Sequence, residues 1–170
     1  KMTALFLSVF NHNNKLNNMS SLALTYVMNL LSRREYSEFE LRCKMQEKAF
    51  SEEDIDQTIA HCQQKNWQSD QRFTESYLNS RSQRGYGINR IKQELRQLKG
   101  IESATIEAVV RECDIDWSAL ALNVLRKKFP DYKEKQPPKM RQKIWQYMLS
   151  HGFNQEDFAD YVGSDPSEFD

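Results

Sequence analysis

The sequence contains little glycine and proline, with 5 Gly and 4 Pro in 170 residues. An all-β protein with many tight turns needs more of both, because glycine supplies positive φ angles and proline presets φ in turns. Leu, Gln, Glu, Arg and Lys are plentiful instead, and all five are good helix formers. This balance predicts an all-α protein.

Cysteine is also scarce, and the three thiols, Cys43, Cys62 and Cys113, form no C-x-x-C pair. An odd number without such a pair favours a reducing compartment over a disulfide framework, so we expect the thiols to pack as small hydrophobes. No apolar run approaches the roughly 18 residues of a membrane span. The short apolar stretch 4–10 lacks the basic flank and cleavage site of a signal peptide. We therefore expect a soluble, cytoplasmic protein without a membrane partner.

Residues that would carry catalysis or metal binding are few and badly spaced. The three histidines and three cysteines show no zinc-like spacing, and the adjacent His61 and Cys62 would point about 100° apart on a helix. The segment 85–87 (Gly-Tyr-Gly) has neither the third glycine nor the preceding strand of a phosphate-binding loop, so it predicts a turn between helices. No nucleophile with a matching base stands out. We predict that the protein is not an enzyme and holds no cofactor and no metal.

The charges cancel overall, with 24 Lys and Arg against 24 Asp and Glu, but they are unevenly placed. Segment 81–99 has six cations and one acid, and segment 152–170 has six acids and no cation. A second basic cluster occupies 133–143. A basic run is either a solvated face with i,i+4 pairs, such as Arg90–Glu94, or a patch for phosphate or an acidic protein. The residues leave both open, although two clusters favour a polyanionic or filamentous partner.

A repeat is the strongest internal feature of the chain. Segments 49–55, 100–106 and 152–158 each begin with a small and an apolar residue and end with an apolar one, at offsets of 51 and 52 residues. We expect about nine helices of roughly 10–15 residues in three tandem three-helix repeats, stacked into an elongated, curved body because one such unit alone is marginally stable. The expected boundaries are a loose segment 1–18, repeats at 19–68, 69–115 and 116–163, and an acidic tail at 164–170.

Apolar spacing and capping residues place the helices within each repeat. Ser37 and Glu40 have the spacing of a capping box, in which each side chain binds the other residue's backbone N–H. We also expect Ser51, Asp70 and Ser103 to cap helices. The three tryptophans, Trp67, Trp117 and Trp145, are expected mainly in the core. The buried stripes of the first and fifth helices are predicted to be Leu22, Tyr26, Met28, Leu30 and Leu31, and Ile88, Ile91, Leu95 and Leu98.

Several segments together resemble the signature of a known family. Residues 69–73, 77–81, 85–95 and 99–101 closely resemble the central signature of the RecX family, bacterial regulators of the RecA recombinase. Residues 34–41 are similar to the R-x-x-S-x-x-E-L element of that family, and the resemblance extends over roughly residues 20–162. This chain has one residue more than the family pattern before Lys99, which rotates Lys99 about 100° around the helix.

The resemblance implies a helical-repeat protein that is not an enzyme. It implies binding to the RecA–DNA filament and inhibition of its extension, ATP hydrolysis, strand exchange and co-protease activity, in homologous recombination, DNA repair and the SOS response. We expect a monomer that contacts DNA mainly within the filament. The residues expected to contact the filament are Arg81, Arg84, Arg90 and Lys92, then Arg34 and Arg72, then Arg96 and Lys99.

Two other functions remain open. A direct nucleic-acid-binding helical module is one, because three-helix units resemble helix-turn-helix domains in outline. A general helical adaptor for another protein is the other, and it would present an apolar groove in place of a basic face. For Arg34 and Arg72, pairing with a neighbouring helix is an alternative to a contact with the filament.

Overall fold

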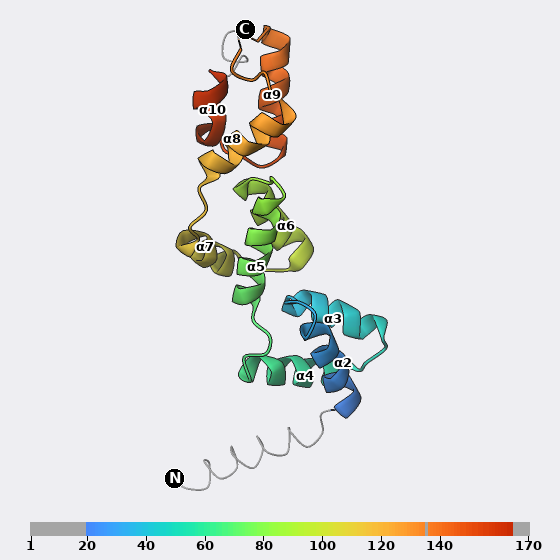
Figure 1. Cartoon of the computed structure of the whole chain (residues 1–170). Coiled ribbons are helices and arrows are strands. Elements are labelled where there is room, and N and C mark those ends of the chain that lie inside the picture. The colour runs from blue at the N-terminus through green and yellow to red at the C-terminus, as the bar shows by residue number, and fades with distance from the viewer. Residues whose placement is uncertain (1–19, 135, 165–170) are drawn as a thin grey trace. The chain divides into compact units, whose positions relative to one another are not determined.

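The computed structural model describes residues 20–134 and 136–164, and within these ranges it contains helices and no strand. Three groups of three helices follow one another, as Figure 1 shows, which confirms the predicted all-α fold of tandem three-helix repeats. The helices are α2 (Ser21–Leu31), α3 (Glu38–Glu47), α4 (Glu52–Gln64), α5 (Asp70–Gln83), α6 (Ile88–Lys99), α7 (Ser103–Glu112), α8 (Trp117–Lys128), α9 (Pro138–Ser150) and α10 (Gln155–Val162).

The described residues form two compact units. One holds the residues up to Phe73 together with 99–101, and the other holds 74–98 together with the residues from Glu102 onward. The repeat boundaries and the elongated, curved shape stay predictions. The expected loose segment 1–18 and the acidic tail after Ser164 lie outside the described residues.

The repeated small residue has a structural cause. It has a positive φ in every repeat, 58° at Ala49, 66° at Gly100 and 91° at Gly152. In each case it lies just beyond the middle helix of its group, where a left-handed residue ends the helix and turns the chain. Glycine is favoured there because it has no Cβ atom to approach the following carbonyl oxygen, and Ala49 adopts the same conformation with a Cβ atom. The residue after next then stands directly before the third helix.

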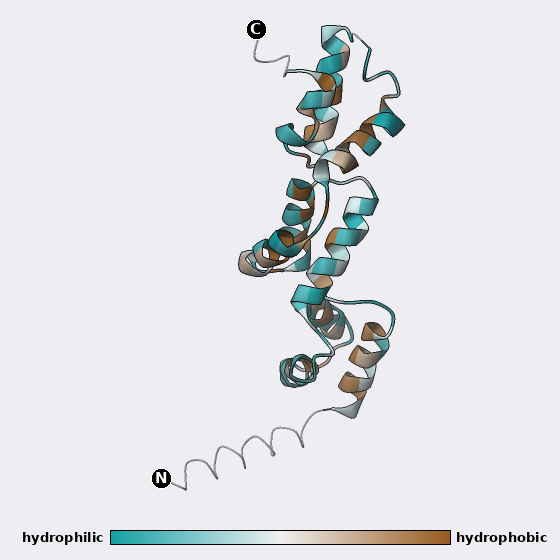
Figure 2. Ribbon diagram, turned by 60° about the vertical axis from the view of Figure 1, so that its left-hand side comes forward, coloured by the Kyte–Doolittle hydropathy of each residue, from teal (hydrophilic) through white to brown (hydrophobic). Residues whose placement is uncertain are grey.

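Each group of helices buries an apolar face. In Figure 2 the helices carry both hydrophobic and hydrophilic stretches, as amphipathic helices do. The first group buries Ala23, Val27, Leu41, Met45, Ile55, Ile59 and Cys62. The middle group buries Leu78, Ile88, Ile91, Leu95, Ile106 and Val109. The third group buries Ala121, Leu125, Ile144, Trp145, Met148, Phe153 and Phe158.

Two predicted stripes need correction at single positions. Leu22 is 74% exposed, whereas Ala23 and Val27 are fully buried. These two residues are four apart on α2, so a narrow, small-residue face of that helix meets α3 and α4. Leu98 is 61% exposed, because the buried stripe of α6 ends at Leu95. The apolar spacing therefore predicted buried faces of α2 and α6 that each include one residue too many.

The predicted caps at Ser37 and Ser51 are confirmed. The Ser37 hydroxyl accepts the Glu40 N–H at 3.1 Å, and the Ser51 hydroxyl accepts the Asp54 N–H at 3.1 Å. The second half of the predicted capping box is wrong. The Glu40 carboxylate binds two cations, described below, in place of the backbone at Ser37.

The other two predicted caps are wrong by one position. Asp70 is the first residue of α5, and the hydroxyl that accepts the Arg72 N–H, at 3.3 Å, belongs to Ser69. Ser103 is likewise the first residue of α7, after Glu102, which makes no side-chain capping bond. Ser69 and Asp70 are both preferred capping residues, so the sequence did not separate them, whereas Glu102 is not a preferred capping residue.

The predicted core residues are partly confirmed. Cys62 and Trp145 are buried, whereas Cys43 and Cys113 are half-buried and Trp67 is 40% exposed. In the described part of the chain no helix is long and apolar enough to cross a membrane. The described residues also bring together no group of three or more His, Cys, Asp or Glu side chains that could hold a metal ion.

Candidate functional site: paired cations and a basic cleft

Six of the eight cations predicted to contact a partner form ion pairs within their own compact unit. They are Arg34, Arg72, Arg81, Arg90, Lys92 and Lys99. Arg84 and Arg96 are exposed, and neither forms an ion pair with any described residue. Arg96 nevertheless acts on Glu107 from a longer distance, because the hydrogen bond from Lys92 and, less strongly, the charge of Arg96 lower the pKa of that carboxyl. The predicted contact residues therefore include two kinds of cation. Some have their charge partly neutralised by a carboxylate, and others leave it available to a partner.

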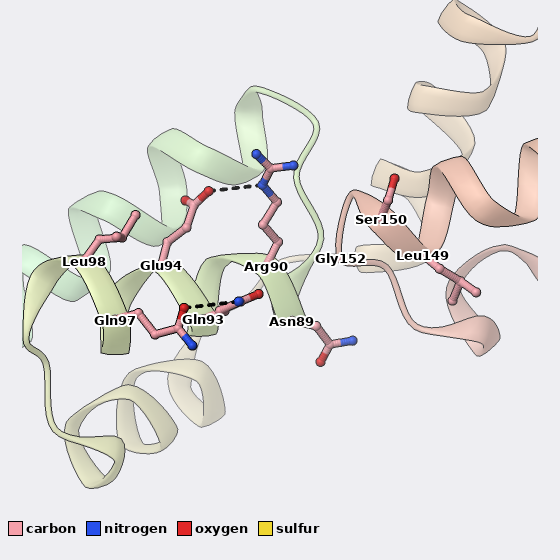
Figure 3. A pocket seen from close by; sticks show the side chains of 9 residues that line it. All are labelled: Asn89, Arg90, Gln93, Glu94, Gln97, Leu98, Leu149, Ser150 and Gly152. Atoms are coloured by element: carbon pink, nitrogen blue, oxygen red, sulfur yellow. Dashed lines mark hydrogen bonds and ion pairs between the residues drawn. The ribbon is translucent and has the colours of Figure 1, made fainter.

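Glu94 gathers the largest of these clusters. Arg81 Nε donates to Glu94 Oε2 at 2.7 Å, Arg90 Nε donates to Oε1 at 3.1 Å, and the Tyr77 hydroxyl donates to Oε2 at 2.9 Å. The Glu94 side chain is only 13% exposed. Burial acts to raise the pKa of Glu94, but the hydrogen bonds from Arg81, Arg90 and Tyr77 outweigh it and lower the pKa below 4.5. The i,i+4 pair expected between Arg90 and Glu94 is confirmed, and Figure 3 shows both side chains on the same side of α6.

Aromatic rings continue from this cluster into the third group of helices. The guanidinium carbons of Arg81 and Arg90 lie 4.0 and 4.4 Å from the ring centre of Tyr86. Tyr86 stacks on His151 at 5.8 Å between ring centres, and His151 stacks on Tyr147 at 3.9 Å. These contacts are favourable cation–π and ring-stacking interactions, and they fix the turn before α6 against α9.

The backbone also ties the start of α6 to the turn between α9 and α10. The Gly87 N–H donates to the His151 carbonyl at 2.8 Å, and the Asn89 N–H donates to the Gly152 carbonyl at 3.0 Å. A Cβ atom on Gly87 would lie 2.3 Å from the Gly152 carbonyl carbon. Gly87, predicted from the sequence to lie in a turn, is thus required by a close contact with the backbone 65 residues further along the chain. A hydrogen bond between the Asn89 and Asn154 side chains spans the same distance in sequence.

Glu40 plays a similar part in the first unit. Its carboxylate accepts from both Nη atoms of Arg34, at 3.0 and 3.3 Å, and from Lys99 Nζ at 2.8 Å. Burial acts to raise the pKa of Glu40, but the hydrogen bonds from Arg34 and Lys99 outweigh it and lower the pKa. The Arg34 guanidinium carbon also lies 3.6 Å from the Tyr36 ring centre. Lys99 is therefore held in place despite the additional residue before it.

Arg72 and Lys92 complete the paired set. Arg72 Nε donates to Glu35 at 2.9 Å, and its other nitrogens donate to the Asn66 side chain and the Trp67 carbonyl. The structure thus gives Arg34 and Arg72 the structural pairing that the sequence left as an alternative. Lys92 Nζ donates to Glu107 at 2.8 Å, but the Glu107 side chain is half exposed, so this pair contributes little to stability.

A basic cleft in the second unit was not predicted. It lies between the α5–α6 turn, α8 and the C-terminal end of α9, and it has a volume of about 770 Å³. Arg84, Lys127 and Lys128 supply its charge, Leu120 and Val124 supply aliphatic surface, and Tyr86, Tyr147 and His151 supply aromatic surface. The sequence signal was the run Arg126-Lys127-Lys128, which ends α8 and also suits the negative end of its dipole. We call this feature the basic cleft.

The second predicted cluster, at 133–143, lies in the loop before α9 and in the first turns of that helix. Lys133, Lys139 and Lys143 are exposed, and Lys135 lies outside the described residues. Arg141 is half-buried, and its Nε is buried without a hydrogen-bond partner among the described atoms. These cations therefore present separate charges rather than one assembled site.

Comparison with known families matches the chain in three parts. Residues 23–62 match the first three-helix domain of RecX, residues 69–110 the second, and residues 114–162 the third. These matches follow the three groups of helices seen in the structure.

Comparison with individual proteins agrees with the family matches. The chain is 69% identical over 146 residues to Regulatory protein RecX of Mannheimia succiniciproducens, covering 86% of this chain and 95% of that protein. It is 66% identical over 152 residues to the protein of the same name from Haemophilus influenzae, covering 89% of this chain and 100% of that protein.

Solved structures show the same fold. A crystal structure of regulatory protein RecX has a TM-score of 0.71 at 20% identity, covering 94% of this chain and 78% of that one. RecX from Lactobacillus salivarius has a TM-score of 0.71 at 21% identity, covering 84% of this chain and 93% of that one.

Proposed function

Because this chain belongs to the RecX family, we propose that it is a non-catalytic regulator that binds the RecA–DNA filament. It would act as a cytoplasmic monomer and restrain filament extension, ATP hydrolysis, strand exchange and co-protease activity. The observation that carries the proposal is the match of all three helix groups to the three domains of one family whose matched relatives are named regulatory proteins.

The ion pairs refine which cations would contact the filament. Glu94 and Glu40 each neutralise part of the charge of two cations, so Arg81, Arg90, Arg34 and Lys99 present less free charge than their number implies. Arg84 and Arg96 are exposed and form no ion pair with a described residue, although Arg96 has a longer-range electrostatic interaction with Glu107. We therefore place Arg84 and Arg96 first among the contact residues, and the paired cations, with Lys92 and Arg72, behind them.

The test is single-stranded-DNA-dependent ATP hydrolysis by RecA, with this protein added well below the RecA concentration. We expect the rate to fall progressively, and Arg84→Glu with Arg96→Glu to weaken the inhibition by about tenfold because two contacts reverse sign. The matched control is Arg33→Glu with Lys65→Glu, two exposed cations of the first unit with the same change of charge. An unchanged rate of ATP hydrolysis with a folded sample would contradict the proposed function.

Direct DNA binding without RecA is the second candidate. The exposed basic end of α8, Arg126 to Lys128, favours it, since exposed cations that neutralise phosphates release the counterions held by DNA. It predicts binding to bare DNA whose affinity falls steeply with salt. Inhibition of RecA with no measurable affinity for bare DNA at moderate salt would reject this candidate.

A further inference from the structure

The basic cleft has positive charge without an internal counter-ion. Arg84, Lys127 and Lys128 line it, and the described residues around it include no aspartate or glutamate. A neighbouring groove of about 360 Å³ contains both Arg90 and Glu94, which bind each other, as Figure 3 shows. Because field lines concentrate in a cleft with walls of one charge, the basic cleft attracts an anion where the neighbouring groove does not.

The same cleft has an apolar side. Leu120 and Val124 are half-buried on one face of α8, four residues apart. The Gly85 turn closes on this face, since a Cβ atom on Gly85 would lie 3.1 Å from Val124 Cγ2. An occupant would therefore meet three cations and two aliphatic side chains, together with the aromatic residues Tyr86, Tyr147 and His151. This combination suits a ligand that carries both negative charge and an apolar group.

Three aromatic residues that line the cleft, Tyr86, Tyr147 and His151, help to decide between a peptide and a nucleic acid strand as its occupant. A single nucleic acid strand is usually held by bases that stack on open aromatic faces, in addition to phosphate contacts. Tyr86, His151 and Tyr147 are stacked on one another, and the Tyr86 ring is also covered by Arg81 and Arg90. Although these three aromatic residues line the cleft, their stacked faces are engaged within the protein, which favours a peptide over a nucleic acid strand.

We infer that the basic cleft binds an acidic segment of a partner protein, with one apolar side chain of that segment against Leu120 and Val124. Its carboxylates would pair with Arg84, Lys127 and Lys128. The volume of about 770 Å³ exceeds what a single carboxylate side chain needs and suits a short stretch of peptide. This inference deepens the proposed function and rests on it, since it makes the contact of the regulator with its target a protein contact at this cleft.

Binding of short labelled probes to the whole chain, without RecA or DNA, tests the inference. The first probe is a fluorescent peptide, Asp-Glu-Glu-Leu-Glu-Glu-Asp. The second has Ser in place of Leu, and the third is a labelled oligothymidine of the same net charge. Fluorescence anisotropy at low and moderate salt gives the three dissociation constants. We expect the leucine peptide to bind most tightly and the serine peptide several-fold more weakly.

The matched variants are Arg84→Glu with Lys127→Glu in the cleft and Arg33→Glu with Lys65→Glu outside it. We expect the cleft variant to weaken binding of the leucine peptide at least about tenfold and the control variant to leave it unchanged. Arg84→Gln with Lys127→Gln, which removes charge without reversing it, gives a smaller loss in the same direction. Circular dichroism confirms that each variant is folded.

Three results would overturn the inference: equal binding of the leucine peptide by the cleft variant and the parent, equal binding of the two peptides, or oligothymidine binding that is tighter and lost in the cleft variant. The last result would assign the cleft to nucleic acid. Since no probe contains RecA, peptide binding in a protein that fails to inhibit RecA would reject the proposed function and keep the cleft. Inhibition of RecA by a protein that does not bind the peptide would support the proposed function and reject the inference about the cleft.

Discussion

The Glu94 cluster and the basic cleft lie in the same unit and are both rich in cations, but they differ in what surrounds the charge. At Glu94 one carboxylate joins two arginines and a tyrosine hydroxyl in a largely buried network. In the cleft, three cations line a cavity without an acidic neighbour among the described lining residues. A run of basic residues in a sequence thus divides into charges that hold the fold together and charges that are available to a partner.

Adding a side chain at Gly87 should disturb both the Glu94 cluster and the basic cleft. In Gly87→Ala the new Cβ would lie 2.3 Å from the backbone at Gly152 and Phe153, so α6 cannot keep its contact with the α9–α10 turn. We expect a loss of about 3 kcal/mol in the free energy of unfolding, measured by urea denaturation. The control, Ser80→Ala, changes an exposed position on α5 and should leave the urea midpoint in place. An unchanged midpoint in Gly87→Ala would mean that this backbone contact is not tight.

Removing the charge of Glu94 should disturb its cluster and spare the cleft. Glu94→Gln keeps the shape but leaves Arg81 and Arg90 without their counter-ion in a partly buried site. We expect about 2 kcal/mol of destabilisation by urea denaturation. Glu107→Gln is the matched control, because the exposed Lys92–Glu107 pair should have no measurable effect. Equal effects of the two substitutions would contradict the division into structural and available cations.

Acid should act on the same carboxylates with a smaller effect. The folded-state pKa values of Glu94 and Glu40 lie below the ordinary value of 4.5. Their contribution to stability is therefore fully present above that value and is lost as the pH falls through the lowered folded-state pKa. Urea denaturation at a series of pH values should show this loss in the parent chain and a reduced loss in Glu94→Gln. Identical pH dependence of the two proteins would exclude Glu94 as a source of the acid sensitivity.

The repeat could be predicted from the sequence because it depends on local rules. The repeated small residue beyond each middle helix has a positive φ, which favours glycine, and it is glycine in two of the three repeats. This local preference recurs at a nearly constant spacing in the sequence. The Arg90–Glu94 pair was predicted for the same reason, since residues four apart on a helix always lie close together. The exposed Leu22 shows the limit, because hydrophobicity alone does not say that α2 packs through Ala23 and Val27.

The division of the cations could not be predicted, because it depends on contacts between residues distant in sequence. Arg81 meets Glu94 across 13 residues, and Lys99 meets Glu40 across 59. The basic cleft combines a turn, the last turns of α8 and the end of α9, which no spacing rule connects. The resemblance to the family signature predicted the family correctly. The signature did not distinguish cations held in ion pairs from cations left exposed.

The smallest effect on stability is expected in the cleft itself. Lys127→Ala and Arg84→Ala each remove an exposed cation that has no carboxylate partner among the described residues, so little native interaction is lost. The free energy of unfolding should stay within about 0.5 kcal/mol of the parent value in urea denaturation. A large destabilisation by either substitution would show that these cations have structural partners, and the contrast between the cleft and the Glu94 cluster would disappear.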